Sequence, residues 1–67
     1  MVIKAKETFA ECRIKKGYSI TGLAEQMQVN PSVVFNMEHG KNVRPATAQK
    51  ACKALNDSFD NLFFIEN

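Results

Sequence analysis

The strongest pattern in this chain is a run of apolar positions at helical spacing in its middle, interrupted by a short polar turn. Residues three, four or seven apart lie on one face of a helix, so such spacing indicates amphipathic helices. The apolar positions are Leu23, Ala24, Met27, Val29, Val34 and Met37. The pattern therefore predicts two short helices that pack on each other and leave one face of the second helix free.

Helix-starting and helix-ending residues give the bounds of these two helices. Ser19 suits the N-cap of a helix from about Ile20 to Met27, and Asn30-Pro31 suits the start of the next, which Gly40 can end after His39. The same signals predict three further helices, at about Lys6 to Lys16, Pro45 to Leu55 and Phe59 to Phe63. Asn56 can end the helix from Pro45 to Leu55 by adopting the left-handed backbone conformation.

We expect an all-α fold of five helices in one domain, residues 1–67, because a chain this short has no room for a second module. The tail from Phe63 to Glu66 is rich in aromatic and β-branched residues. It either ends the last helix or pairs as a short strand with Val2 to Lys4. The expected fold is therefore helical, with or without a two-stranded pairing of the chain ends.

Composition then limits the classes of function. No paired carboxylates, nucleophile–base set or phosphate loop is visible, so we do not expect an enzyme. Cys12 and Cys52 lack metal-ligand spacing and sit at apolar positions, so we expect reduced thiols and neither metal nor cofactor. No apolar run approaches the roughly 20 residues of a membrane span. Because charges interrupt residues 1–7 at once, we expect no signal peptide and a cytoplasmic protein.

Charge is unevenly distributed along the chain, although the net charge is only +2. Residues 1–56 carry nine Lys and Arg against four Asp and Glu, whereas residues 57–67 carry three acidic residues and no basic one. A basic body opposite an acidic end would orient the molecule on a polyanion such as DNA. Chance asymmetry on a solvated surface remains the alternative.

The free face of the helix that begins at Pro31 is the candidate base-reading surface. Ser32, Phe35, Asn36 and His39 follow an i, i+3, i+4, i+7 spacing and share one stripe. A short helix with such a face can enter the major groove, where an asparagine amide matches adenine N6 and N7. Ser32 suits a base edge or a phosphate, and His39 suits a phosphate, a base N7 or only solvent. Phe35 suits either a thymine methyl group or a protein partner.

The loop after this helix is the candidate phosphate-binding segment. Lys41, Asn42 and Arg44 lie between two predicted helices, where a loop can straddle the DNA backbone. Arg44 occupies the N-cap of the following helix, where arginine is a poor cap and its charge opposes the helix dipole. A bound phosphate would remove that conflict. We also assign phosphate binding to Ser19, at the start of the earlier helix.

The residues then show a resemblance over about Phe9 to Phe63. The chain resembles the Cro/repressor-type helix-turn-helix family of lambda-repressor-like, XRE-type domains from phages and mobile elements. The matching segments are Cys12-Arg13 with Gly17, Leu23-Ala24-Glu25, Val29-Asn30, Met37-Glu38-His39-Gly40-Lys41, Asn42-Val43-Arg44-Pro45 and Phe59-Asp60-Asn61-Leu62-Phe63. The resemblance implies a five-helix bundle, an ion pair of Arg13 with Glu38, and a homodimer on a palindromic operator. Family members of this kind usually repress transcription.

Three positions depart from the family pattern. Gln28 stands where the turn usually has glycine, and Ile20 stands where a polar residue often binds phosphate. Pro31, Val33 and Phe35 make the recognition stripe more apolar than is usual. The apolar stripe indicates either thymine-rich DNA targets or a surface turned toward a protein.

Two questions of assembly follow from the same residues. The C-terminal residues Phe63, Phe64 and Ile65 are more apolar than a last helical turn requires, so we expect part of them in the core and the rest in a dimer contact. The alternative to a DNA-binding regulator is a protein-interaction module on the same fold. Such an antirepressor or antitoxin-like adaptor would bind its partner through Phe35 and Val33.

Overall fold

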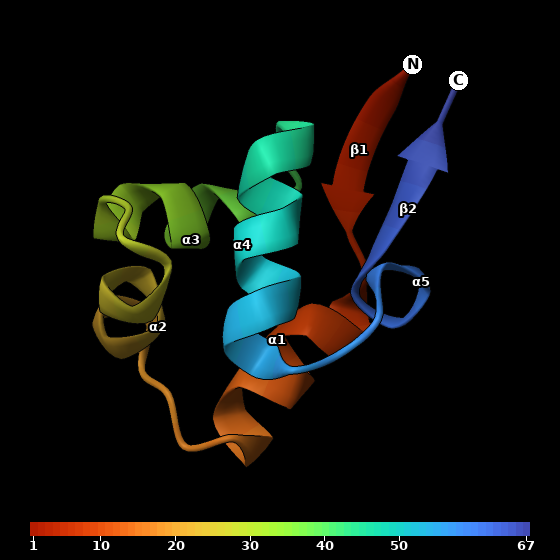
Figure 1. The fold of residues 1–67 in the computed structure, drawn as a ribbon. Coiled ribbons are helices and arrows are strands. Elements are labelled where there is room, and N and C mark those ends of the chain that lie inside the picture. The colour runs from red at the N-terminus through yellow and green to blue at the C-terminus, as the bar shows by residue number, and fades with distance from the viewer.

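The computed structural model describes all residues, 1–67, as five helices and one small sheet. The elements in chain order are β1 (Val2–Ala5), α1 (Glu7–Lys15), α2 (Ile20–Met27), α3 (Pro31–Glu38), α4 (Pro45–Leu55), α5 (Phe59–Leu62) and β2 (Phe63–Glu66). Figure 1 shows α4 in the middle, with α2 and α3 on one side and the strands on the other. None of the helices is both long and apolar enough to span a membrane.

The predicted starts of the central helices are confirmed. The Ser19 side chain accepts a hydrogen bond of 2.9 Å from the Gly22 N–H, and Asn30 Oδ1 accepts one of 2.9 Å from the Ser32 N–H. Each bond satisfies a first-turn donor that has no partner inside its own helix. Pro31 takes the first position of α3, where its missing N–H costs nothing. Local sequence therefore determines where α2 and α3 begin.

The turn between α2 and α3 forms without glycine. Gln28 adopts the left-handed conformation with φ of 59°, as expected for a residue that replaces glycine here. The Val29 N–H then donates to the Ala24 carbonyl at 3.0 Å, which closes the end of α2. Residues other than glycine are disfavoured in the left-handed conformation. The packing of α2 against α3 must therefore offset the cost of this backbone conformation at Gln28.

The core contains 13 buried residues, all apolar, contributed by all five helices and both strands. Its largest members are Phe9, Phe63, Leu23, Leu55, Leu62 and Val34. Three residues predicted to face inward, Cys12, Val29 and Cys52, are only half-buried. All three pack against the core. Both thiols are free.

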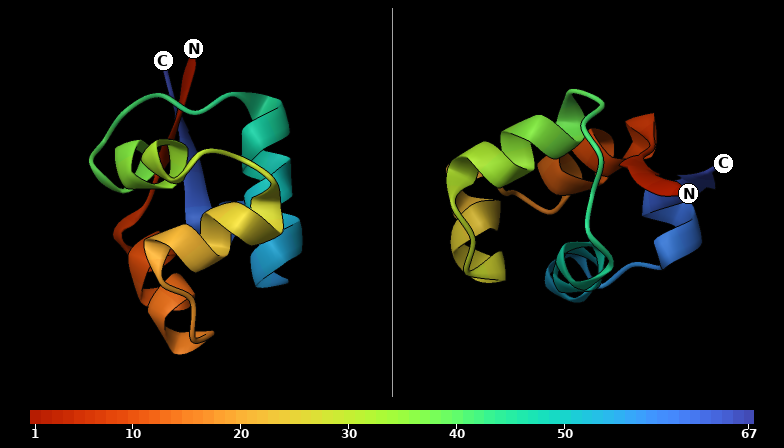
Figure 2. Two further views of the ribbon diagram at one scale, coloured as in Figure 1. Left: turned by 90° about the vertical axis from the view of Figure 1, so that its left-hand side faces the viewer. Right: turned by 90° about the horizontal axis from the view of Figure 1, so that it is seen from above.

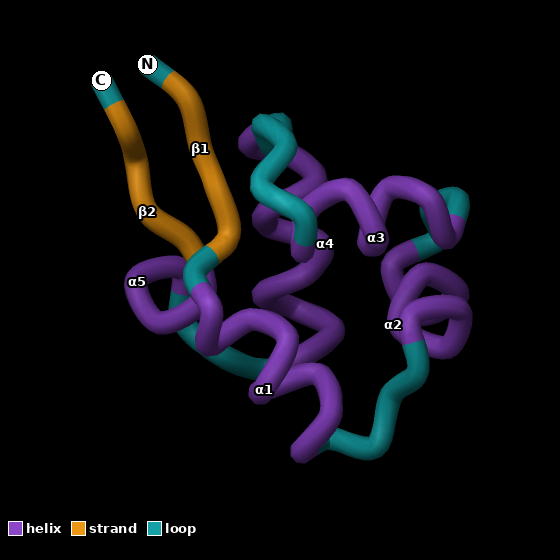
Figure 3. Tube along the Cα trace, turned by 180° about the vertical axis from the view of Figure 1, so that it is seen from behind, coloured by secondary structure: helices purple, strands orange, loops and turns teal.

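The two ends of the chain pair as short strands, which was one of the two alternatives predicted from the sequence. β1 and β2 are antiparallel, and the register places Ile3 opposite Ile65 and Lys4 opposite Phe64. On its other edge, β1 accepts a 2.8 Å hydrogen bond from the Val43 N–H at the Ile3 carbonyl. The sheet therefore holds the loop between α3 and α4 (Figures 2 and 3).

The dimer assignment of Phe63 is wrong. Phe63, the first residue of β2, faces the core and is 1% exposed. The centroid of its ring lies 5.5 Å from that of the Phe9 ring. Phe63 also ends α5 one residue earlier than predicted, since its backbone is already extended. Phe64 and Ile65 remain at the surface, 38% and 52% exposed.

One polar cluster anchors α5 to α1. Asp57 accepts hydrogen bonds from the Ser58 N–H at 2.8 Å, from the Asn61 side chain at 2.8 Å, and from Cys12 Sγ at 3.4 Å. The bonds from Ser58 and Asn61 hold the pKa of the Asp57 carboxyl below its usual value. Burial and the nearby carboxylate raise the pKa of the Cys12 thiol, so this thiol is protonated at neutral pH.

Candidate nucleic-acid interface

The structure brings the predicted base-reading residues together on the outer face of α3. Pro31, Ser32, Phe35, Asn36 and His39 are all exposed. The opposite face is closed, because the side chains of Val34 and Met37 lie in the core. The side chains of Ser32 and Asn36 make no hydrogen bond within the chain. Their donors and acceptors are therefore available to a partner outside it.

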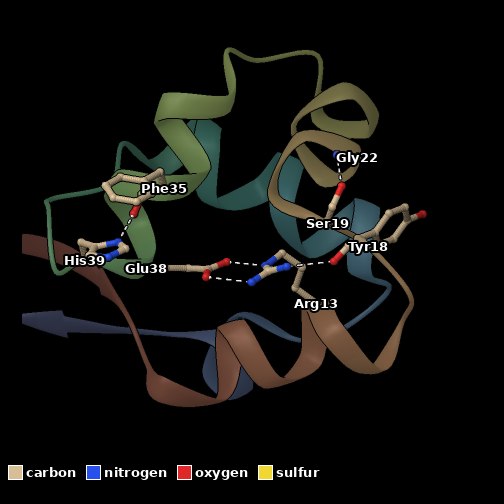
Figure 4. Close-up of polar contacts among 7 residues, drawn as sticks. All are labelled: Arg13, Tyr18, Ser19, Gly22, Phe35, Glu38 and His39. Atoms are coloured by element: carbon tan, nitrogen blue, oxygen red, sulfur yellow. Dashed lines mark hydrogen bonds and ion pairs between the residues drawn. The ribbon is translucent and has the colours of Figure 1, made fainter.

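Phe35 and His39 form an aromatic pair that was not predicted from the sequence. Their ring centroids lie 3.9 Å apart with an angle of 20° between the planes, and His39 Nδ1 lies 2.7 Å from the Phe35 carbonyl oxygen (Figure 4). A carbonyl oxygen only accepts, so Nδ1 carries the hydrogen. In the neutral imidazole Nε2 is then an acceptor, whereas in the imidazolium both ring nitrogens donate. The i, i+4 spacing of the two aromatic residues was the available signal.

Three of the four predicted phosphate-binding residues, Lys41, Asn42 and Arg44, line one groove together with part of α3. This groove of about 480 Å³ lies between α3, the following loop and the start of α4. Its lining consists of Val33, Asn36, Met37, Lys41, Asn42, Val43, Arg44 and Thr47. It contains two cationic side chains and no acidic one. Thr47 was missed, although it lies one helical turn after Arg44 and therefore on the same side of α4.

The start of α4 has no side-chain cap. Arg44 holds the extended N-cap conformation but makes no capping hydrogen bond, whereas Ser19, Asn30 and Ser58 cap α2, α3 and α5. The first N–H groups of a helix carry partial positive charge and need acceptors. Here the exposed Arg44 side chain adds a further positive charge.

A partly buried ion pair fixes α3 relative to α1. Arg13 Nε donates to Glu38 at 2.6 Å and Arg13 Nη2 donates at 3.1 Å, while the two side chains are only 12% and 9% exposed. Arg13 Nη1 also donates to the Tyr18 carbonyl at 2.8 Å, just before the N-cap of α2 (Figure 4). One guanidinium group therefore joins α1, the start of α2 and the end of α3. The pair with Glu38 was expected, but the bond to Tyr18 was not.

Ser19 lies apart from the other predicted phosphate-binding residues. In Figure 4 the Arg13–Glu38 pair stands between Ser19 and the Phe35–His39 pair. Ser19 does not line the groove, and its hydroxyl oxygen accepts the capping bond from Gly22. The hydroxyl hydrogen remains available to an acceptor. Val33 is half-buried at the groove wall.

Comparison with known proteins agrees with this geometry. A family model described as helix-turn-helix matches residues 9–62, which include α2 to α5 and all of α1 except its first two residues. No curated protein matches the chain. The matched family consists of DNA-binding regulators rather than enzymes. The chain therefore belongs to the Cro/C1-type (XRE) helix-turn-helix family and is a DNA-binding regulator of this kind.

Proposed function

We propose that this protein is a sequence-specific transcriptional repressor that binds a palindromic operator as a homodimer. One observation carries the proposal. The unpaired amide of Asn36 belongs both to the exposed stripe of α3 and to the wall of the cationic groove. A base-reading group and phosphate-binding groups thus lie side by side, as a major-groove contact requires. The lambda-repressor-like character and the origin from a phage or mobile element are part of the proposal because the family resemblance implies them.

In this arrangement α3 enters the major groove and the groove beside it receives the DNA backbone. Asn36 offers one donor and one acceptor to an adenine, and Ser32 offers a hydroxyl to a base edge or phosphate. Lys41, Asn42 and Arg44 bind phosphate, and the uncapped start of α4 supplies further N–H donors. Ser19, beyond the Arg13–Glu38 pair, contacts the backbone on the other side of α3.

The homodimer would form through the exposed C-terminal strand. Phe64 and Ile65 present apolar side chains at the surface, and β2 pairs with β1 alone. The free edge of β2 offers unpaired backbone groups to a second copy. A two-fold axis there would set two α3 helices about one DNA turn, roughly 34 Å, apart.

Selection from a random duplex library tests this function. The protein is incubated with the library at about 150 mM salt, where nonspecific binding is weak, and the bound fraction is sequenced. The proposal predicts a palindromic motif whose half-sites lie one helical turn apart. A non-palindromic motif would contradict the dimer, and the absence of any enriched motif would contradict sequence-specific binding. Sedimentation of the protein alone and with the selected duplex measures the dimer directly.

The second candidate function is a protein-interaction module on the same fold. The 49% exposure of Phe35 on the outer face of α3 favours it, because an exposed aromatic residue is typical of binding hot spots. This candidate would place Phe35 and Val33 against a partner protein. A library selection without enrichment, together with loss of partner binding in Phe35→Ala, would support it over the DNA-binding proposal.

A further inference from the structure

The Phe35–His39 pair combines two chemical features at one place on α3. The Phe35 ring is half exposed and offers apolar surface. In its neutral form the His39 imidazole, held by its Nδ1–H on the Phe35 carbonyl, offers the lone pair of Nε2. An apolar surface beside a hydrogen-bond acceptor is a defined recognition unit, and neither feature serves the core.

We propose that Phe35 and His39 together read an A·T base pair, with Phe35 on the thymine C5-methyl group and His39 Nε2 accepting from the adenine N6 amino group. This inference rests on the proposed function, which places α3 in the major groove. The A·T pair is the only pair that presents both a methyl group and an N6 amino donor there. The apolar stripe then has a specific use in base recognition.

The same chemistry disfavours the other bases. Guanine presents N7 and O6, which are both acceptors, and would face the acceptor Nε2 without a donor between them. Cytosine offers an amino donor but has no methyl group, so Phe35 would lose its apolar contact. His39 therefore discriminates against guanine, and Phe35 discriminates between thymine and cytosine.

The pair is already ordered before DNA arrives. Ring stacking at 3.9 Å and the 2.7 Å hydrogen bond restrict both side chains on one face of α3. Groups that are fixed in advance lose less conformational entropy on binding than mobile ones do. Substitution of His39 should therefore weaken methyl recognition by Phe35 as well as its own hydrogen bond.

Thymine methyl groups can be removed without any change in base pairing. The duplex selected by the wild-type protein is synthesised with deoxyuridine in place of thymidine at one position at a time. Binding is measured by fluorescence anisotropy for wild type, Phe35→Ala and the control Ile14→Ala, which removes an exposed apolar side chain from α1. We expect about a fourfold loss of affinity at one position in each half-site, as for burial of one methyl-sized group. The loss should persist in Ile14→Ala and disappear in Phe35→Ala.

Three outcomes would overturn the inference. Equal affinity for thymine and uracil duplexes would show that no methyl group is read, although the proposed function would still stand. Methyl sensitivity that persists in Phe35→Ala would assign the methyl contact to another residue. Failure of wild type to select any duplex would contradict the proposed function and this inference with it. Circular dichroism of each variant verifies that the fold is intact.

Discussion

The two faces of α3 differ in what their side chains contact. On the inner face, Val34 and Met37 are buried and Glu38 is bound to Arg13. On the outer face, Ser32 and Asn36 are exposed and have no hydrogen-bond partner in the chain. The inner face therefore fixes the position of the helix, and the outer face remains free for recognition. It follows that stability and DNA recognition should respond to different substitutions on one eight-residue helix.

The largest effect is expected on the inner face. Glu38→Ala leaves the Arg13 guanidinium group mostly buried without its carboxylate. We expect the free energy of unfolding to fall by about 3 kcal/mol, as for other broken buried pairs. Urea denaturation measures the change. The control Glu25→Ala, at an exposed position on α2, should change stability by less than about 0.5 kcal/mol. A loss below about 1 kcal/mol for Glu38→Ala would show that the pair does not fix α3.

The matching substitution on the outer face is Asn36→Ala. Loss of the two hydrogen bonds of the amide should weaken binding to the selected duplex by about 2 kcal/mol. Binding to random duplex DNA should change far less, and the free energy of unfolding should stay within about 0.5 kcal/mol of the wild-type value. Anisotropy titrations on both duplexes test this separation. Equal losses on both duplexes would contradict base reading by Asn36.

Substitution of Arg44 should change stability and DNA affinity in opposite directions. Arg44→Ser supplies α4 with a side-chain cap and removes a charge that opposes its dipole, so we expect about 1 kcal/mol of added stability. DNA binding should weaken, and the slope of log affinity against log salt concentration should fall by about one. Lys50→Ser, on the exposed side of α4 outside the groove, is the matched control. An unchanged salt slope in Arg44→Ser would refute phosphate binding by Arg44.

The smallest effect is expected in the turn before α3. Gln28 holds a left-handed backbone that glycine adopts without steric cost. Gln28→Gly should therefore raise the free energy of unfolding by about 0.5 to 1 kcal/mol, with DNA affinity unchanged. A loss of stability would mean that the Gln28 side chain makes a packing contribution larger than this backbone cost.

Most of the fold could be predicted because its signals are local. Ser19, Asn30 and Gly40 mark helix ends through their own backbone preferences, and the observed bounds of α2 match the predicted ones. The ends of α1, α3 and α5 differ by one residue, which is the usual uncertainty where helices fray. The apolar content of the tail offered the pairing of the chain ends as one of two alternatives, and the structure shows that pairing.

What the sequence could not show depends on contacts between distant residues or on side-chain geometry. The inward direction of Phe63 follows from its place opposite Ala5 in the sheet, which no local signal provides. The bond of Arg13 to the Tyr18 carbonyl and the entry of Thr47 into the groove depend on how α1, α2 and α4 are placed. The stacking of Phe35 on His39 depends on rotamers.

A titration of the ¹⁵N-labelled protein with the selected duplex, followed by two-dimensional NMR, tests the division of α3 most directly. Our account predicts the largest shifts at Ser32, at the Asn36 side-chain amide and from Lys41 to Arg44, with Val34 and Met37 little changed. Shifts centred instead on the β1–β2 sheet or on the outer side of α1 would contradict it, because DNA would then bind a surface other than the outer face of α3.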